Sequence, residues 1–110
     1  MLTRSKEKHL TGVGATLKAE HRSRAGEVHA HIWEITAWFY YDPSICALTA
    51  RYALEQVLKS YQGKCLPDRI AWGEDLAAEI ARSLASEYRT PIQVDVVRHE
   101  ERIYAKWASS

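Results

Sequence analysis

The residues that most constrain this chain are a continuous run of strand formers at 28–41, VHAHIWEITAWFYY. β-Branched and aromatic side chains favour the pleated, half-buried surface of a sheet. The next residues are Asp42 and Pro43, and proline ends a strand because it has no N–H to donate to the ladder. The run therefore predicts the strongest strand of the chain.

The spacing of apolar residues in the rest of the chain predicts three more strands and two helices. Apolar residues alternate with a two-residue period before the polar turn HRSRAGE, and three- and four-residue spacings mark the helices. The expected strands are 13–21, 28–41, 92–98 and 102–107, and the expected helices are 47–61 and a second one that begins near 73. The apolar positions of the first helix are Leu48, Tyr52, Leu54, Val57, Leu58 and Tyr61. Those of the second are Leu76, Ile80 and Leu84.

The order strand, strand, helix, helix, strand, strand predicts an α+β domain. We expect an antiparallel four-stranded sheet with two helices on one face. A chain of 110 residues suits one domain with a single core. Residues 1–11 are expected to form a flexible leader, and residues 12–110 the domain.

Large aromatic side chains would occupy both faces of the strand at 28–41. Trp38 and Tyr40 alternate with Phe39 and Tyr41. One pair can pack against the helices, and the other pair favours burial between subunits. The alternative is that Tyr40 and Tyr41 are half-exposed at the end of the strand.

Composition excludes several classes of function. The formal net charge of +1 argues against a nucleic-acid binder with a broad basic surface. No apolar run approaches the roughly 20 residues that span a bilayer, and the first ten residues, MLTRSKEKHL, do not form a secretory signal. Two cysteines, Cys46 and Cys65, do not make a disulfide framework. We expect a cytoplasmic protein that binds neither nucleic acid nor membrane.

Three histidines form a candidate metal site. His29 and His31 are two residues apart on one strand, so they project from the same face. His21 ends the preceding strand, and a hairpin would bring it within reach of the other two. Three imidazoles with an open fourth position are typical of catalytic zinc. Structural or surface histidines are the alternative.

The sequence around these histidines resembles the 6-pyruvoyltetrahydropterin synthase and 6-carboxytetrahydropterin synthase family. LKAEH followed by HAHIWEI is similar to the family's F-x-A-A-H and H-G-H-N-Y-E-V segments, with Trp33 and Glu34 at the positions of its Tyr-Glu pair. WGEDLAAEIARSL resembles P-T-x-E-N-I-A, and HEERIYAKW resembles E-T-P-x-x-W-A-E-Y.

The resemblance implies a fold, a metal and a class of ligand. The fold would be the tunnelling fold, in which subunits join their sheets into a barrel, as a homo-oligomer such as a trimer or a dimer of trimers. His21, His29 and His31 match the three zinc ligands. The implied activity is a zinc-dependent lyase reaction on a pterin-like small molecule.

The residues that carry out proton transfer in the family are missing. Ala25 stands where the family has its cysteine, and Tyr61-Gln62-Gly63 stands where it has L-D-H. Glu27 lies close to the lost cysteine and is the candidate general base, although a solvated turn residue is the alternative. Cys46 and Cys65 are expected to be small packed residues.

The family glutamate that anchors the pterin lies near the start of the final hairpin. His99 aligns there, with Arg98 or Glu100 after a one-residue slip. Only Glu100 could accept the same paired hydrogen bonds. His99 and Glu100 are therefore the candidate substrate-binding residues, and His99 is also a candidate proton carrier.

Three interpretations follow. The first is a diverged zinc enzyme acting on a pterin-like heterocycle. The second is an inactive binding or assembly homologue of that family. The third is another α+β domain in which the histidines are incidental.

Overall fold

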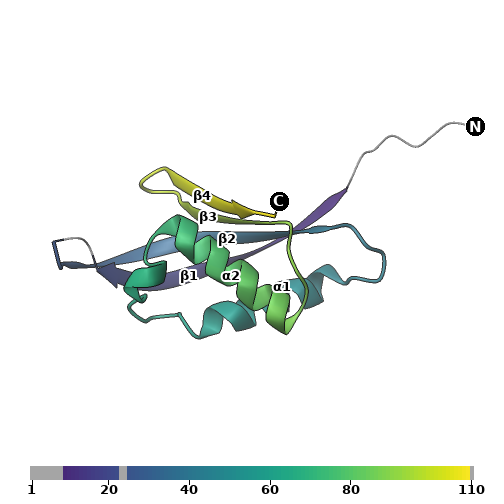
Figure 1. Cartoon of the computed structure of the whole chain (residues 1–110), viewed down its shortest axis with the longest axis horizontal. Coiled ribbons are helices and arrows are strands. Elements are labelled where there is room, and N and C mark those ends of the chain that lie inside the picture. Colours follow the sequence, from purple (N-terminus) through teal and green to yellow (C-terminus); the bar gives the residue numbers. More distant parts are fainter. Residues whose placement is uncertain (1–8, 23–24, 110) are drawn as a thin grey trace, which may run out of the picture.

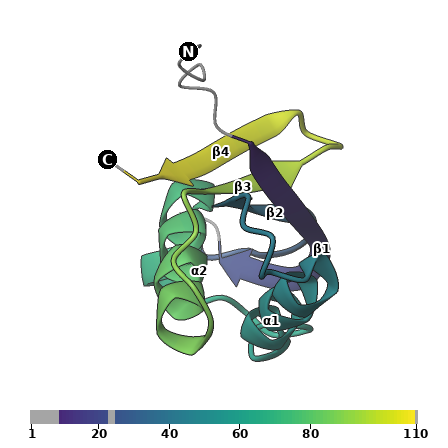
Figure 2. The ribbon, with the colours of Figure 1, turned by 90° about the vertical axis from the view of Figure 1, so that its right-hand side faces the viewer.

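The computed structural model describes residues 9–22 and 25–109. Its elements in chain order are β1 (Leu10–Arg22), β2 (Val28–Tyr40), α1 (Ala47–Lys59), the 3-10 helix η1 (Asp68–Ile70), α2 (Gly73–Glu87), β3 (Gln93–Arg98) and β4 (Ile103–Ala108). The four strands form one antiparallel sheet in the order β1-β2-β3-β4. Both long helices lie on the same side of this sheet (Figures 1 and 2). The predicted α+β fold and its element order are confirmed, and η1 is an addition.

The first strand begins earlier than the sequence indicates. β1 starts at Leu10, so Leu10 and Thr11 pair with β2 and belong to the sheet. Residues 1–8 of the expected leader lie outside the described residues. Within the part of the chain that the structure describes, no helix has both the length and the apolar character needed to cross a membrane.

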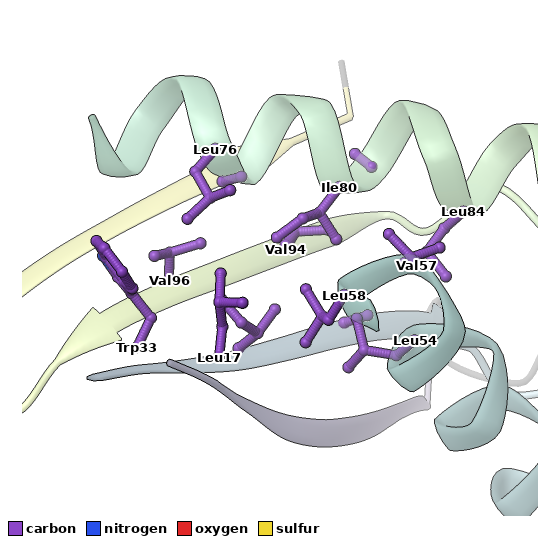
Figure 3. Packing of buried hydrophobic residues seen from close by; sticks show 14 of the residues in the cluster. Leu17, Trp33, Leu54, Val57, Leu58, Leu76, Ile80, Leu84, Val94 and Val96 are labelled. Carbon is purple, nitrogen blue, oxygen red and sulfur yellow. The ribbon is translucent and has the colours of Figure 1, made fainter. Parts of the chain in front are cut away.

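The core fills the space between the sheet and the two helices (Figure 3). Alternate residues of each strand point to the helices, and those of β2 run from Trp33 to Phe39. The helices contribute the buried side chains Ala50, Leu54, Val57, Leu58, Leu76, Ala77, Ile80, Ala81 and Leu84. The predicted stripe of the second helix is therefore buried.

The predicted buried face of α1 is partly wrong. Leu48 and Tyr52 are 74% and 63% exposed. The helix packs on the stripe that begins at Ala50 and continues through Leu54, which turns residues 48 and 52 to its flank. Tyr61 follows the end of α1 and packs against the core while remaining partly exposed.

The two faces of the aromatic segment have different surroundings. Phe39 is buried under the helices, whereas Tyr40 and Tyr41 are 50% and 61% exposed. Trp38 lies on the open face, where its Nε1 donates a hydrogen bond to Asp95 Oδ2 at 2.8 Å. Its ring covers Gly12 of the neighbouring strand. Trp38 was expected to be buried by another subunit. Part of its contacts on the open face instead come from neighbouring strands of the same sheet.

One end of the β1–β2 hairpin extends beyond β3. β3 pairs with β2 from Glu34 to Trp38, whereas β1 pairs along the whole length of β2. At this end, a segment after α1 runs along the outer edge of β1. Gly63 N donates to Lys18 O at 2.7 Å, and Leu66 N donates to Glu20 O at 2.7 Å. The segment leads into η1 and the start of α2, which lie over the projecting hairpin.

Candidate metal centre and ligand cavity

The hairpin brings the three histidine rings together on its helix-covered face. His21 is directly opposite His29, and His31 lies opposite Ala19. The ring centroids of His21 and His31 are 4.6 Å apart, and that of His29 is 6.2 Å from each of the others. Strand alternation and the hairpin register account for this cluster, because both place odd-numbered residues on one face.

His21 and His31 point their Nε2 atoms at each other across 2.8 Å. On the far side of each ring, His21 Nδ1 lies 3.2 Å from the Ala71 carbonyl oxygen, and His31 Nδ1 lies 3.0 Å from Glu101 Oε1. Both of these partners are acceptors, so each Nδ1 carries the hydrogen. Each neutral ring then has a lone pair on Nε2. Two lone pairs that face each other repel, and a shared cation, either a proton or a metal ion, would relieve this repulsion.

Electrostatics disfavours the proton. Burial lowers the pKa of His21, although the hydrogen bond to Ala71 opposes the shift. Burial also lowers the pKa of His31, and the positive charge of Arg98 adds to the effect on both rings. Both imidazoles are therefore neutral near pH 7, which is the form that ligates metals.

His29 does not complete a three-ligand cage in this arrangement. Its Nε2 lies 3.6 Å from Glu27 Oε2, and both side chains are largely exposed. Among residues 9–22 and 25–109, no group of three or more histidine, cysteine, aspartate or glutamate side chains is arranged to hold a metal ion. The His29 ring would have to turn away from Glu27 to join the other two.

The donor set nevertheless fits zinc chemically. Zn–N bonds of about 2.0–2.1 Å at tetrahedral angles place two ligand nitrogens about 3.3 Å apart, so the Nε2 atoms of His21 and His31, now 2.8 Å apart, would separate by about 0.5 Å to bind the ion. Ligating histidines usually donate their second N–H to a carbonyl or a carboxylate. Ala71 and Glu101 provide one of each.

A cavity of about 500 Å³ lies against the histidines. Its aromatic walls are Trp33 and Trp72, and the ring centroid of each lies 6.1 Å from that of His21. The remaining walls come from the first turn of α2 and from the β3–β4 hairpin, which contributes Arg98. This size and lining suit a small, flat organic molecule.

Two of the three candidates for the ligand anchor do not line this cavity. His99 is exposed in the β3–β4 turn, where its carbonyl oxygen accepts a hydrogen bond from Arg102 N at 3.2 Å. Glu100 and Glu101 line a different hollow of about 370 Å³ together with Lys18, Glu20 and Ile32. Arg98, the residue before the turn, is the one that faces the histidine cavity.

The other residues singled out in the sequence lie in different parts of the fold. Trp33 is buried beside His31, with 5.5 Å between ring centroids. Glu34 is on the opposite face, where it accepts a hydrogen bond from Thr16 Oγ1 at 3.1 Å. Cys46 and Cys65 are free and exposed, so the expectation that they are small packed residues is wrong. Backbone N–H groups of Thr49 and Leu48 lower the pKa of the Cys46 thiol.

Gln62 has a structural role. Its Oε1 accepts a hydrogen bond from Lys18 N at 3.0 Å, and its Nε2 donates to Thr16 O at 2.8 Å. The side chain thereby fastens the end of α1 to the outer edge of β1. Ala25, at the position of the family cysteine, is exposed in the hairpin turn.

Sequence reasoning missed Glu101 and the Ala71 carbonyl. Glu101 is adjacent to Glu100, and nothing in RHEER shows which carboxylate returns to the histidines. The answer depends on the turn, which closes with Arg102 in the left-handed conformation at φ 57°. The Ala71 carbonyl follows η1, an element that left no recognisable signal in the sequence.

Comparison with known proteins identifies the fold. No family model matches the chain, and no curated protein matches it in sequence. The solved structure of Caenorhabditis elegans 6-pyruvoyl tetrahydropterin synthase superposes with a TM-score of 0.71. The match covers 94% of this chain and 97% of that chain, at 14% sequence identity. This chain therefore has the subunit fold of a 6-pyruvoyl tetrahydropterin synthase, as the resemblance in sequence implied.

Proposed function

We propose that this chain is a diverged, zinc-dependent relative of 6-pyruvoyltetrahydropterin synthase that acts on a pterin-like heterocycle. The observation that carries the proposal is the pair of Nε2 atoms of His21 and His31, which face each other at 2.8 Å with both Nδ1 positions hydrogen-bonded. His29 would supply the third nitrogen after its ring turns from Glu27. Zinc bound there would polarise a substrate carbonyl or lower the pKa of a substrate hydroxyl.

The cavity beside the histidines is the proposed substrate site. The indoles of Trp33 and Trp72 offer an apolar lining for a planar ring. Its volume of about 500 Å³ lies within the usual range of about 300–1,000 Å³ for small-molecule sites. The three histidines form one wall, so the side chain of a ring seated there would reach them.

Glu27 is the proposed proton carrier. Its carboxylate lies 3.6 Å from His29 Nε2, at the mouth of the cluster. A carboxylate there can accept a proton from a substrate carbon or hydroxyl held near the metal. Neither residue lines the cavity, but Glu27 contacts His29, which makes the exposed His99 the weaker candidate.

A non-catalytic binding or assembly subunit is the second candidate function. Two observations favour it. Ala25 cannot transfer protons, and the Gln62 amide is engaged with the backbone of β1. A chain of this kind would bind zinc and ligand without turnover.

We further propose a cytoplasmic homo-oligomer, a trimer or a dimer of trimers. Exposed apolar side chains on the open face of the sheet support association. They are Leu10, Val28, Ile32, Tyr40 and Tyr104. The free thiols of Cys46 and Cys65 are compatible with a reducing compartment.

The test is the zinc content of the purified full chain. Wild type should contain about one zinc per chain, and His31→Ala and His29→Ala should each lose most of it. His9→Ala is the matched control, because His9 is exposed and precedes β1. A metal-free wild type that does not take up added zinc would refute the proposal. Binding of dihydroneopterin without turnover by the zinc-loaded protein would select the second candidate.

A further inference from the structure

Arg98 is a cation that lines the cavity, and its ion pair with Glu101 is long. It ends β3 on the same face as Val94 and Val96, and its side chain is only 17% exposed. Its Nε is buried and has no hydrogen-bond partner among the described residues. The ion pair recorded for this atom is with Glu101 Oε1 at 3.9 Å, too long for a hydrogen bond, and that oxygen already accepts from His31.

The rest of the cavity lining is short of negative charge. Glu74 is the one carboxylate among the described residues that line it, and this residue is exposed. Gly73 and Glu74 form the first turn of the 15-residue helix α2, whose N-cap side chain makes no capping hydrogen bond. The positive end of the helix dipole lies at the cavity, although Glu74 and Asp75 in the same turn offset part of it.

The chemistry of Arg98 determines which ligand group it can bind. A guanidinium has N–H donors and no acceptor, so it cannot hold the amino and ring N–H groups that a glutamate anchors. It matches a carboxylate or a phosphoryl group, which can take two parallel hydrogen bonds. A ligand group without a hydrogen-bond acceptor would leave the buried Nε unpaired, which is costly, and an oxyanion also pairs with the positive charge of the guanidinium.

We propose that Arg98 is a specificity-determining residue that binds an oxyanion, a carboxylate or phosphoryl group, carried by the heterocyclic ligand. The inference deepens the proposed function, because it takes the histidine cavity to be the ligand site. It changes the class of substrate from a neutral ring held by a carboxylate to an anionic ring compound held by a guanidinium.

The experiment compares ligands that differ in charge. The full chain, as purified, is titrated with orotate, with its uncharged parent uracil and with inorganic phosphate, and binding is followed by ligand-observed NMR. Orotate should bind at least about 10-fold more tightly than uracil. Arg98→Gln should weaken orotate binding about 10–100-fold and leave uracil binding unchanged, whereas Arg98→Lys should recover part of the loss. Competition between phosphate and orotate distinguishes a general oxyanion site from one specific for carboxylates.

Two controls make the result decisive. Arg89→Gln removes an arginine outside the cavity, whose partner is Asp42 at 3.4 Å, and should change nothing. Circular dichroism establishes that each Arg98 variant is folded. Equal binding of orotate and uracil, or orotate binding that survives Arg98→Gln, would overturn the inference whether or not zinc is bound. Arg98-dependent oxyanion binding by a protein that takes up no zinc would instead refute the proposed function alone.

Discussion

Glu101 accepts a hydrogen bond from His31 Nδ1 at 3.0 Å, although the two residues are 70 positions apart in the chain. Arg98 Nε lies 3.9 Å from the same oxygen, so an imidazole and a guanidinium meet at this carboxylate. Although desolvation opposes it, the Glu101 backbone N–H, Arg98 and His31 together lower the pKa of the carboxyl group. Glu101 is thus ionised near pH 7 and fixes which nitrogen of His31 carries the hydrogen.

Glu101→Gln should therefore weaken zinc binding. The amide oxygen can still accept from His31, but the negative charge that makes the imidazole a better ligand is lost. We expect a loss of about 10–100-fold in zinc affinity, as is usual for such supporting carboxylates. Competition with a chelating indicator measures it. Glu100→Gln, one residue away and without a hydrogen bond to His31, should bind zinc like wild type. Equal affinities of the two variants would contradict this role.

The pH dependence of zinc binding should follow from the lowered pKa values of His21 and His31. Both lie below the ordinary value of 6.5, chiefly because of burial. Protons compete with zinc for the ring nitrogens only when pH falls to the pKa of the rings. Affinity should therefore hold from about pH 8 to about pH 6.5 and decline below that value.

Arg98 contributes to the lowered pKa values of His21 and His31, and replacing it tests this cause. Its charge lowers the pKa of both rings. In Arg98→Gln the pKa values should rise and the decline in zinc affinity should begin at higher pH. Arg89→Gln should keep the wild-type profile. A wild-type decline that begins above pH 6.5 would contradict the lowered pKa values.

The sheet was predictable because its signals are local. Val28–Tyr40 carries its own strand propensity, and the two-residue period decides which faces its histidines share. The face of α1 was harder to predict. The small Ala50 is in the core while Leu48 is exposed, so hydrophobicity alone misplaced the first turns of the buried stripe. Which residues of α1 are buried at its start also depends on the path of the chain between β2 and α1, which the local pattern of the helix does not specify.

The candidate site shows the same division. Alternation along two paired strands was enough to group His21 with His31. The sequence could not show which of residues 98–100 faces the cavity. The answer depends on where β3 ends, because a shift of one residue along a strand moves a side chain to the other face of the sheet. The partners of the histidines, Ala71 and Glu101, lie in connections whose course is fixed by tertiary packing.

Gln62→Ala tests whether this residue fastens α1 to β1. The variant loses hydrogen bonds to Lys18 N and Thr16 O. Because the side chain is exposed, water replaces part of the loss, and we expect the free energy of unfolding to fall by about 1 kcal/mol. Gln56→Ala, on the exposed face of α1, is the matched control and should be neutral. Urea denaturation measures both, and equal midpoints would rule out the fastening role.

Gly12→Ala should destabilise the open face of the sheet. A methyl group at residue 12 would lie 2.7 Å from the ring of Trp38, and the hydrogen bond to Asp95 keeps that ring in place. Such overpacking costs about 1–3 kcal/mol of unfolding free energy. The Trp38 ring could move away from the added methyl group only by breaking its 2.8 Å hydrogen bond to Asp95.

Gly14→Ala provides the comparison on the same strand. Its methyl group would meet the Ile35 carbonyl oxygen at 3.5 Å, an ordinary contact. Since alanine loses less backbone entropy than glycine on folding, this variant should be as stable as wild type or slightly more stable. Urea denaturation should separate the two variants by more than about 1 kcal/mol. If Gly12→Ala were as stable as Gly14→Ala, Trp38 would not be held over β1, and the cover of the open face would have to come from elsewhere.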